Sequence, residues 1–344
     1  MIQDTYVLSD SQKRERRRLA IMFTILAVLI VALFLVSMNT GAIRLTPLEV
    51  LRTLFGGGTS DQDLILFTFR LPRIVLSVLV GAGLGVAGCV LQAITRNALA
   101  EPGIIGINAG AGLFVLVFTA FYASPAASPV YLLPLLAWAG AGISAVIVFS
   151  LSYRKHRGFS STRLLLNGIS ITAGISSVTI VITQRIDAEQ YQFYARWISG
   201  TISGQDWKFV LAVLPFLAVL IPYVMYKSRT INVLNLGQTM AVGLGARVTR
   251  EQAGLLAAAI GLAGACVSVS GSIGFVGLIG PHLARRLVGT KHQVLIPASA
   301  LVGGLLVIAA DTISRMWLQD TPTGVIVAVV GAPYFLYLMI RSKM

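Results

Sequence analysis

Side chains that could carry catalysis are few in this sequence. The three histidines, His156, His282 and His292, show no His-x-x-x-His or Glu-x-x-His spacing that would place two metal ligands on one helix face. The chain has no Gly-x-x-x-x-Gly-Lys-Ser/Thr phosphate loop, no paired carboxylates and no Ser/His constellation. We therefore expect no catalytic residue, no metal site and no cofactor in this chain, so that any energy from ATP comes from a partner chain.

One acidic residue, Asp311, lies within a long apolar run. Ion-coupled transporters keep acidic groups inside the membrane because such groups bind protons or sodium. Arg315 follows Asp311 by four residues, a spacing that pairs opposite charges on one helix face. We favour a structural ion pair over an ion site, and this argues against ion coupling.

The composition places these residues in a membrane protein. Of 344 residues, 56% are hydrophobic and 12% are charged, and the mean hydropathy is +0.82. A soluble domain carries about 25% charged residues, so a soluble enzyme, a disordered chain and a nucleic-acid-binding protein are all excluded. Cys89 and Cys266 lie in apolar runs far apart in the sequence, which excludes a disulfide framework.

Apolar runs bounded by charge predict about ten transmembrane helices, since a helix needs about 20 residues to cross a bilayer. A count of nine or eleven stays open. The first run follows a basic segment and is either a signal peptide or a retained helix; we favour a retained helix because the run is long and lacks a clear cleavage site. The predicted spans are 19–38, 72–94, 104–122, 130–150, 164–183, 208–226, 253–270, 274–288, 294–311 and 324–340.

Charge assigns the two sides of the membrane. With ten spans, both termini lie on one side, and the loops of that side carry 19 of the 27 basic residues and a net charge of +14, against +1 on the other side. Because basic loops stay in the cytoplasm, both termini are predicted to be cytoplasmic. The whole chain, 1–344, is one transmembrane domain with a basic N-terminus at 1–18.

Two glycine-containing segments suggest an internal repeat. The segment Pro102-Gly103-Ile104-Ile105-Gly106 follows the second span, and a similar segment, 270–274, follows the seventh. Five helices separate the two, so spans 2–5 and 7–10 would form an inverted repeat, as in many transporters. With 34 glycines in the chain, chance similarity is the alternative.

Four further motifs are more specific than a general apolar pattern. Arg70-Leu71-Pro72-Arg73 precedes the second span, and Thr95-Arg96-Asn97-Ala98-Leu99-Ala100-Glu101-Pro102-Gly103 follows it. A glycine ladder, 271–282, ends in Pro281-His282, and Pro322-Thr323-Gly324-Val325 opens the last span, which contains Gly331-Ala332-Pro333. Together, in this order and spacing from about residue 40 onward, these motifs resemble the FecCD-type permeases of ABC importers. Ala98 and Gly280 depart from the family pattern, where proline and a larger apolar residue are usual.

The resemblance implies an all-α integral membrane protein with the BtuC-like permease fold, in the cytoplasmic membrane of a prokaryote. Such permeases pair with a second permease, identical or related. They bind two cytoplasmic ABC ATPase subunits, which hold ATP and Mg, and receive substrate from an extracytoplasmic binding protein. The family implies docking of that protein at Arg70, Arg73 and Arg315; arginines that extend toward the membrane interface are the alternative.

The segment 229–252 resembles the cytoplasmic loop through which the family contacts its ATPase. Within it, residues 234–248 read as a short amphipathic helix interrupted by glycine. Binding of this helix in the lipid headgroups is the alternative. The residues expected to couple are Leu236, Gly237, Ala241, Gly243, Gly245 and Arg247.

The substrate pathway is the least specific prediction. The fifth span carries polar residues that suit a weakly binding wall, and the outer segment after it carries aromatic residues that form either the pathway mouth or an interfacial belt. The predicted lining residues are Asn167, Ser170, Ser176, Tyr194 and Trp197. Family frequency favours a ferric siderophore as substrate, with haem or vitamin B12 as alternatives; an ion-coupled transporter and a channel are less favoured.

Overall fold

The computed structural model is almost entirely helical and describes residues 10–41, 45–121, 131–154, 158–202, 206–318 and 321–341. A two-stranded antiparallel ribbon pairs Tyr153–Arg154 (β1) with Gly158–Phe159 (β2). The helices are α1 (Asp10–Asn39), α2 (Pro47–Leu54), α3 (Ser60–Asp63), a π-helical turn η1 (Leu64–Arg70), α4 (Leu71–Thr95), a 3₁₀ turn η2 (Pro102–Ile105), α5 (Ile107–Phe121), α6 (Leu132–Ser152), α7 (Ser161–Thr183), α8 (Ala188–Ile198), α9 (Trp207–Tyr226), α10 (Ser228–Asn235), α11 (Gln238–Gly243), α12 (Val248–Ser270), α13 (Val276–Val288), α14 (His292–Trp317) and α15 (Thr323–Arg341).

Each predicted membrane span overlaps one helix, namely α1, α4, α5, α6, α7, α9, α12, α13, α14 or α15. Within the described residues, seven helical segments are long and apolar enough to cross a membrane. The segments in α5 and α15 are shorter, and α13 has 13 residues. The ends of the predicted spans at residues 122 and 130, and the terminal segments 1–9 and 342–344, lie outside the described residues.

The core is built around α4, which contacts α12, α13 and α14. Glycine allows these helices to approach closely. A Cβ atom at Gly81 would lie 2.2 Å from the carbonyl oxygen of Gly303, and one at Gly88 would lie 1.8 Å from that of Gly277. Membrane helices associate through such close packing of small residues rather than through a hydrophobic drive.

Two long helices have little cover within the chain. Each long helix has an 18-residue stretch that is its most apolar. In α1 and in α7, 6% of that stretch is buried inside the protein, against 78% for the segment Ser60–Thr95. An apolar helix with so little protein contact requires lipid or another protein around it.

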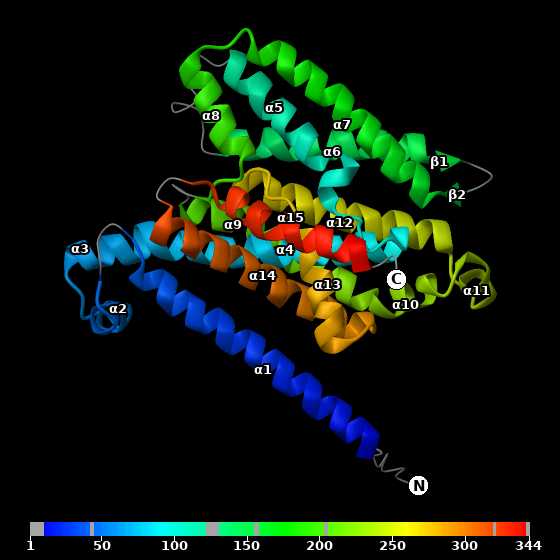
Figure 1. The fold of residues 1–344 in the computed structure, drawn as a ribbon, viewed down its shortest axis with the longest axis horizontal. Coiled ribbons are helices and arrows are strands. Elements are labelled where there is room, and N and C mark those ends of the chain that lie inside the picture. Colours follow the sequence, from blue (N-terminus) through cyan, green and yellow to red (C-terminus); the bar gives the residue numbers. More distant parts are fainter. Residues whose placement is uncertain are drawn as a thin grey trace.

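The molecule has two distinct ends (Figure 1). The end that carries α2, α3 and the start of α4 is called the arginine end, after Arg70 and Arg73. The end that carries α10, α11 and the β1–β2 ribbon is called the loop end. Helix α4 runs from the arginine end to the loop end, and α12 runs in the opposite direction (Figure 1). The first turn of α1 and the last turns of α15 both lie toward the loop end (Figure 1).

The helix lengths follow the expected repeat. Helices α4 to α7 have 25, 15, 21 and 23 residues, and α12 to α15 have 23, 13, 26 and 19. The first matching segment also lies against α13, the helix that follows the second, since a Cβ atom at Gly277 would lie 2.7 Å from Cδ of Pro102. A long helix followed by a short one in both halves, with opposite directions of α4 and α12, agrees with an inverted repeat.

Candidate functional site

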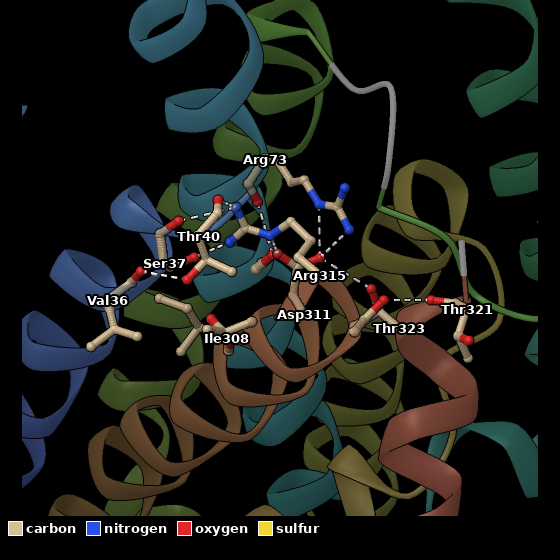
Figure 2. A network of polar contacts seen from close by, with 12 residues as sticks. Val36, Ser37, Thr40, Arg73, Ile308, Asp311, Arg315, Thr321 and Thr323 are labelled. Atoms are coloured by element: carbon tan, nitrogen blue, oxygen red, sulfur yellow. Dashed lines mark hydrogen bonds and ion pairs between the residues drawn. The ribbon is translucent and has the colours of Figure 1, made fainter. Parts of the chain in front are cut away.

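The arginine end is organised around the carboxylate of Asp311, which is fully buried near the end of α14. Arg73, in the first turn of α4, donates from Nε to Asp311 Oδ1 at 2.8 Å, and its Nη2 lies 2.7 Å from the same oxygen. The hydroxyl of Thr323 also donates to Oδ1, at 3.2 Å. One carboxylate oxygen therefore joins the starts of α4 and α15 to the end of α14 (Figure 2).

Arg315 lies on the opposite side of this carboxylate from Arg73 (Figure 2). Its Nε is 3.1 Å from Asp311 Oδ2, but the two groups are not aligned for a hydrogen bond. Its Nη1 donates to the carbonyl oxygens of Ser37 at 3.1 Å and Thr40 at 3.2 Å, and its Nη2 donates to the Ser37 hydroxyl. The predicted pair of Asp311 with Arg315 is thus present, and the stronger partner of Asp311 is Arg73.

Arg70 contributes to the same region from the end of η1. Its side chain donates to the carbonyl oxygen of Met38, and the residue is 6% exposed. Ser37, Met38 and Thr40 belong to the last turn of α1 and the residue after it, where carbonyl groups lack helical partners. Arg70 and Arg315 therefore cap the end of α1, where cations are favoured by the helix dipole.

The structure brings together all three arginines that the family pattern singled out, in what we call the arginine cluster: Arg70, Arg73, Arg315 and Asp311. Three guanidinium groups and one carboxylate give the arginine cluster a net charge of +2. Arg73 and Arg315 are mostly buried, with side chains 18% and 11% exposed. A partly buried excess of positive charge favours an anionic partner.

At the loop end, the segment 234–248, predicted as an interrupted amphipathic helix, contains the last residues of α10 and the whole of α11. Gly237, between them, has a φ of +115°, and Gly245, after α11, has a φ of +81°. Both conformations favour glycine because a side chain would be strained there. Ala241 is buried and anchors α11, while Gly243 and Arg247 are exposed.

The outer surface of this loop is apolar. Leu236, Met240, Val242 and Leu244 are each about 60% exposed, at 59%, 62%, 58% and 63%. Exposed apolar side chains grouped on a polar end of a protein are typical of a protein contact surface.

Polar contacts hold the base of the loop. Arg96 donates to the carbonyl oxygen of Leu234 at 2.8 Å, and the side chains of Lys227 and Glu251 pair at 2.8 Å. The hydrogen bond to Glu251 raises the pKa of Lys227 above its ordinary value. These contacts attach α10 to the ends of α4, α9 and α12 and leave α11 projecting.

The predicted pathway residues do not share one surface. Ser170 and Ser176 lie on the exposed face of α7, and Asn167 donates to the Ser152 hydroxyl at 3.0 Å. Tyr194 on α8 is 7% exposed, and Trp197 is half-buried. Their role in lining a substrate pathway stays a prediction.

The sequence analysis missed Glu101, whose polar neighbours resemble an ordinary surface turn. Its carboxylate accepts a hydrogen bond at 3.0 Å from the backbone N–H of Phe275, the residue before α13. Phe275 has a φ of +64°, which is strained for a residue with a side chain. The half-buried Glu101 therefore joins the loop after α4 to the start of α13.

Among the described residues, no group of three or more His, Cys, Asp or Glu lies close enough to hold a metal ion.

Comparison with known proteins gives one consistent family. The profile of the FecCD transport family matches residues 28–341. The iron(3+)-hydroxamate import system permease FhuG of Bacillus subtilis is 42% identical over 337 residues, covering 96% of this chain and all of that permease. The hemin transport system permease HmuU of Yersinia pestis is 35% identical and covers 94% and 96% of the two chains. A solved metal-chelate type ABC transporter in an inward-facing conformation has a TM-score of 0.81 at 28% identity, covering 94% and 99%.

Proposed function

The chain belongs to the FecCD transport family, and from this premise we propose that it is the permease subunit of an ATP-driven importer for a ferric hydroxamate siderophore. It is a multi-pass membrane permease. The observation that carries the proposed substrate is the 42% identity to an iron(3+)-hydroxamate permease over that protein's whole length. The hemin permease, at 35%, and a cobalamin permease of Halobacterium salinarum, 39% identical over 285 residues, make haem and vitamin B12 the alternatives.

The arginine cluster is the proposed docking site for an extracytoplasmic substrate-binding protein. The net charge of +2 of this cluster suits acidic side chains of such a partner. Complementary charge speeds the encounter and fixes the orientation of two docking surfaces. Arg73, the most exposed of the three arginines, is the proposed main contact, with Arg70 and Arg315 adding to the local field.

The loop end is the proposed contact for two cytoplasmic ATPase subunits, which hold ATP and Mg. Support comes from the exposed apolar side chains of Leu236, Met240, Val242 and Leu244 on a loop whose base is fixed. Closure of the ATPase pair on ATP would move α11, and α10 would carry that motion to the ends of α4 and α12. Such coupling requires two states that both partners bias.

A second permease is the proposed cover of α7. This helix exposes Leu166, Ile169, Ile180 and Val181 at 59% to 64%, together with the hydroxyl groups of Ser170 and Ser176. A mixed polar and apolar surface suits a helix that faces a partner subunit and, between the two subunits, a route for a polar chelate.

The proposed orientation places the loop end, with both termini, in the cytoplasm. The basic residues of the loops on that side support it under the positive-inside rule.

Affinity purification of the tagged chain in mild detergent, followed by identification of co-purifying proteins, tests the assembly. We expect an ABC ATPase to co-purify with the chain. A second, related permease is recovered if the permease pair is heterodimeric, and this chain is the recovered permease if the pair is homodimeric. Recovery of the chain without any ATPase, from membranes in which it supports iron uptake, would contradict the proposal.

A further inference from the structure

Arg73 uses only one edge of its guanidinium group inside the protein. Nε and Nη2 both contact Oδ1 of Asp311, at 2.8 and 2.7 Å. The remaining nitrogen, Nη1, has no hydrogen-bond partner among the described residues, and it is not among the buried polar atoms that lack a partner. It therefore reaches solvent, and it points away from Asp311 (Figure 2).

A guanidinium group can bind two carboxylates at once. Its donors form a planar fork, with one edge at Nε and Nη2 and a second at Nη1 and Nη2. We propose that Asp311 is a positioning residue for docking: it holds Arg73 by the first edge and so presents the second edge to a carboxylate of the extracytoplasmic partner. This inference rests on the proposed docking role of the arginine end.

The surroundings of Asp311 favour this positioning role over the alternative, in which Asp311 only competes with the partner's carboxylate for Arg73. Asp311 is fully buried, and its Oδ1 also accepts the Thr323 hydroxyl at 3.2 Å while its Oδ2 faces Arg315 at 3.1 Å. A carboxylate fixed from three sides does not move aside when a partner arrives. Because the guanidinium group is already ordered in the free permease, docking costs less conformational entropy.

The two roles predict opposite effects when the carboxylate is lost. If Asp311 only competed, its removal would raise the local net charge and strengthen docking. If Asp311 positions Arg73, its removal releases the guanidinium and weakens docking, although the local charge becomes more positive.

The asymmetry of the two carboxylate oxygens provides a rescue variant. Oδ1 accepts hydrogen bonds from Arg73 Nε and from the Thr323 hydroxyl and lies 2.7 Å from Arg73 Nη2, whereas Oδ2 faces only the poorly aligned Nε of Arg315. In Asp311→Asn, we expect the amide oxygen to take the Oδ1 position and keep Arg73 in place. Asp311→Ala keeps neither contact.

The test measures the affinity of the purified permease–ATPase complex for its binding protein. We expect Asp311→Ala to raise the dissociation constant about tenfold, which is the scale of one well-formed polar contact, and Asp311→Asn to stay within about twofold of wild type. Because Asp311 acts through Arg73, the effect of Asp311→Ala should disappear in an Arg73→Gln background. Wild-type or tighter docking of Asp311→Ala, or an undiminished loss in that background, would overturn the inference.

Arg73→Lys keeps the test decisive if Asp311→Ala does not assemble. Lysine retains the charge and the pair with Asp311 but has no second planar edge. We expect about tenfold weaker docking for this variant, and wild-type affinity would overturn the inference. If Arg73→Gln itself leaves docking unchanged, the proposed docking role fails; if it weakens docking while Arg73→Lys does not, only the inference fails.

Discussion

Arg73 and Asp311 lie 238 positions apart in the sequence, and both Nε and Nη2 of the arginine contact one carboxylate oxygen. This pair joins the first turn of α4 to α14, two helices at the centre of the molecule. Arg315 and Arg70 extend the contact to the end of α1. The surface proposed to receive the binding protein is thus connected directly to the packed core.

Arg73→Gln should weaken docking of the binding protein by more than about tenfold and reduce the dependence of docking on salt, because it removes one screened charge together with both edges of the guanidinium group. Affinity measured at several salt concentrations checks this. Arg52→Gln is the matched control, since Arg52 is an exposed arginine on α2 outside the cluster. Equal affinities for the two variants would contradict the docking site.

Arg315→Gln should release the end of α1. It removes donors to the carbonyl oxygens of Ser37 and Thr40, and we expect a loss of about 1–3 kcal/mol in stability because buried acceptors lose charged donors. Thermal unfolding in detergent measures the loss, with Arg52→Gln again as control. Unchanged stability would mean that α1 is held by lipid and α14 packing alone.

The sequence was sufficient to predict the membrane helices, because long apolar runs are local features. It also predicted Asp311 with Arg315, which are one helical turn apart. It could not predict Asp311 with Arg73, because that contact depends on the packing of α4 against α14. The capping of α1 by Arg70 and Arg315 was equally invisible, since its acceptors are backbone carbonyl groups.

Gly243→Trp should abolish uptake without loss of the protein from the membrane. A Cβ atom at Gly243 would meet no atom within 4 Å, so the isolated chain tolerates a side chain and any loss reports a contact with a partner. ATP-dependent uptake and the amount of membrane protein are measured together. Gly142→Trp, at a glycine of α6 with equally open surroundings, should keep uptake; normal uptake by Gly243→Trp would contradict the assigned ATPase contact.

Glu101→Ala should destabilise the start of α13 by about 1–2 kcal/mol, because the N–H of Phe275 loses its acceptor. Glu101→Gln, which retains a carbonyl oxygen, should lose less. Thermal unfolding of both variants checks the order. Equal losses would show that the charge of Glu101, rather than its hydrogen bond, supports α13.

Glu101 also shows where sequence patterns mislead. Its neighbours Arg96 and Asn97 predict a solvated turn, yet the turn folds back and places the carboxylate against Phe275. Likewise, α2, α3 and α8 were not predicted, because short helices outside the apolar runs leave only weak periodicity. The arginine cluster needed the family pattern, since arginines near a membrane surface have a common alternative role.

In the proposed function, ATP drives this permease to import a ferric hydroxamate. The most direct test is uptake of iron-labelled ferric hydroxamate into proteoliposomes that contain the permease, its ATPase and the binding protein, with and without enclosed ATP and Mg. We expect accumulation only with ATP, unaffected by ionophores that abolish proton and sodium gradients. Accumulation driven by either gradient in the absence of ATP would contradict the proposed function.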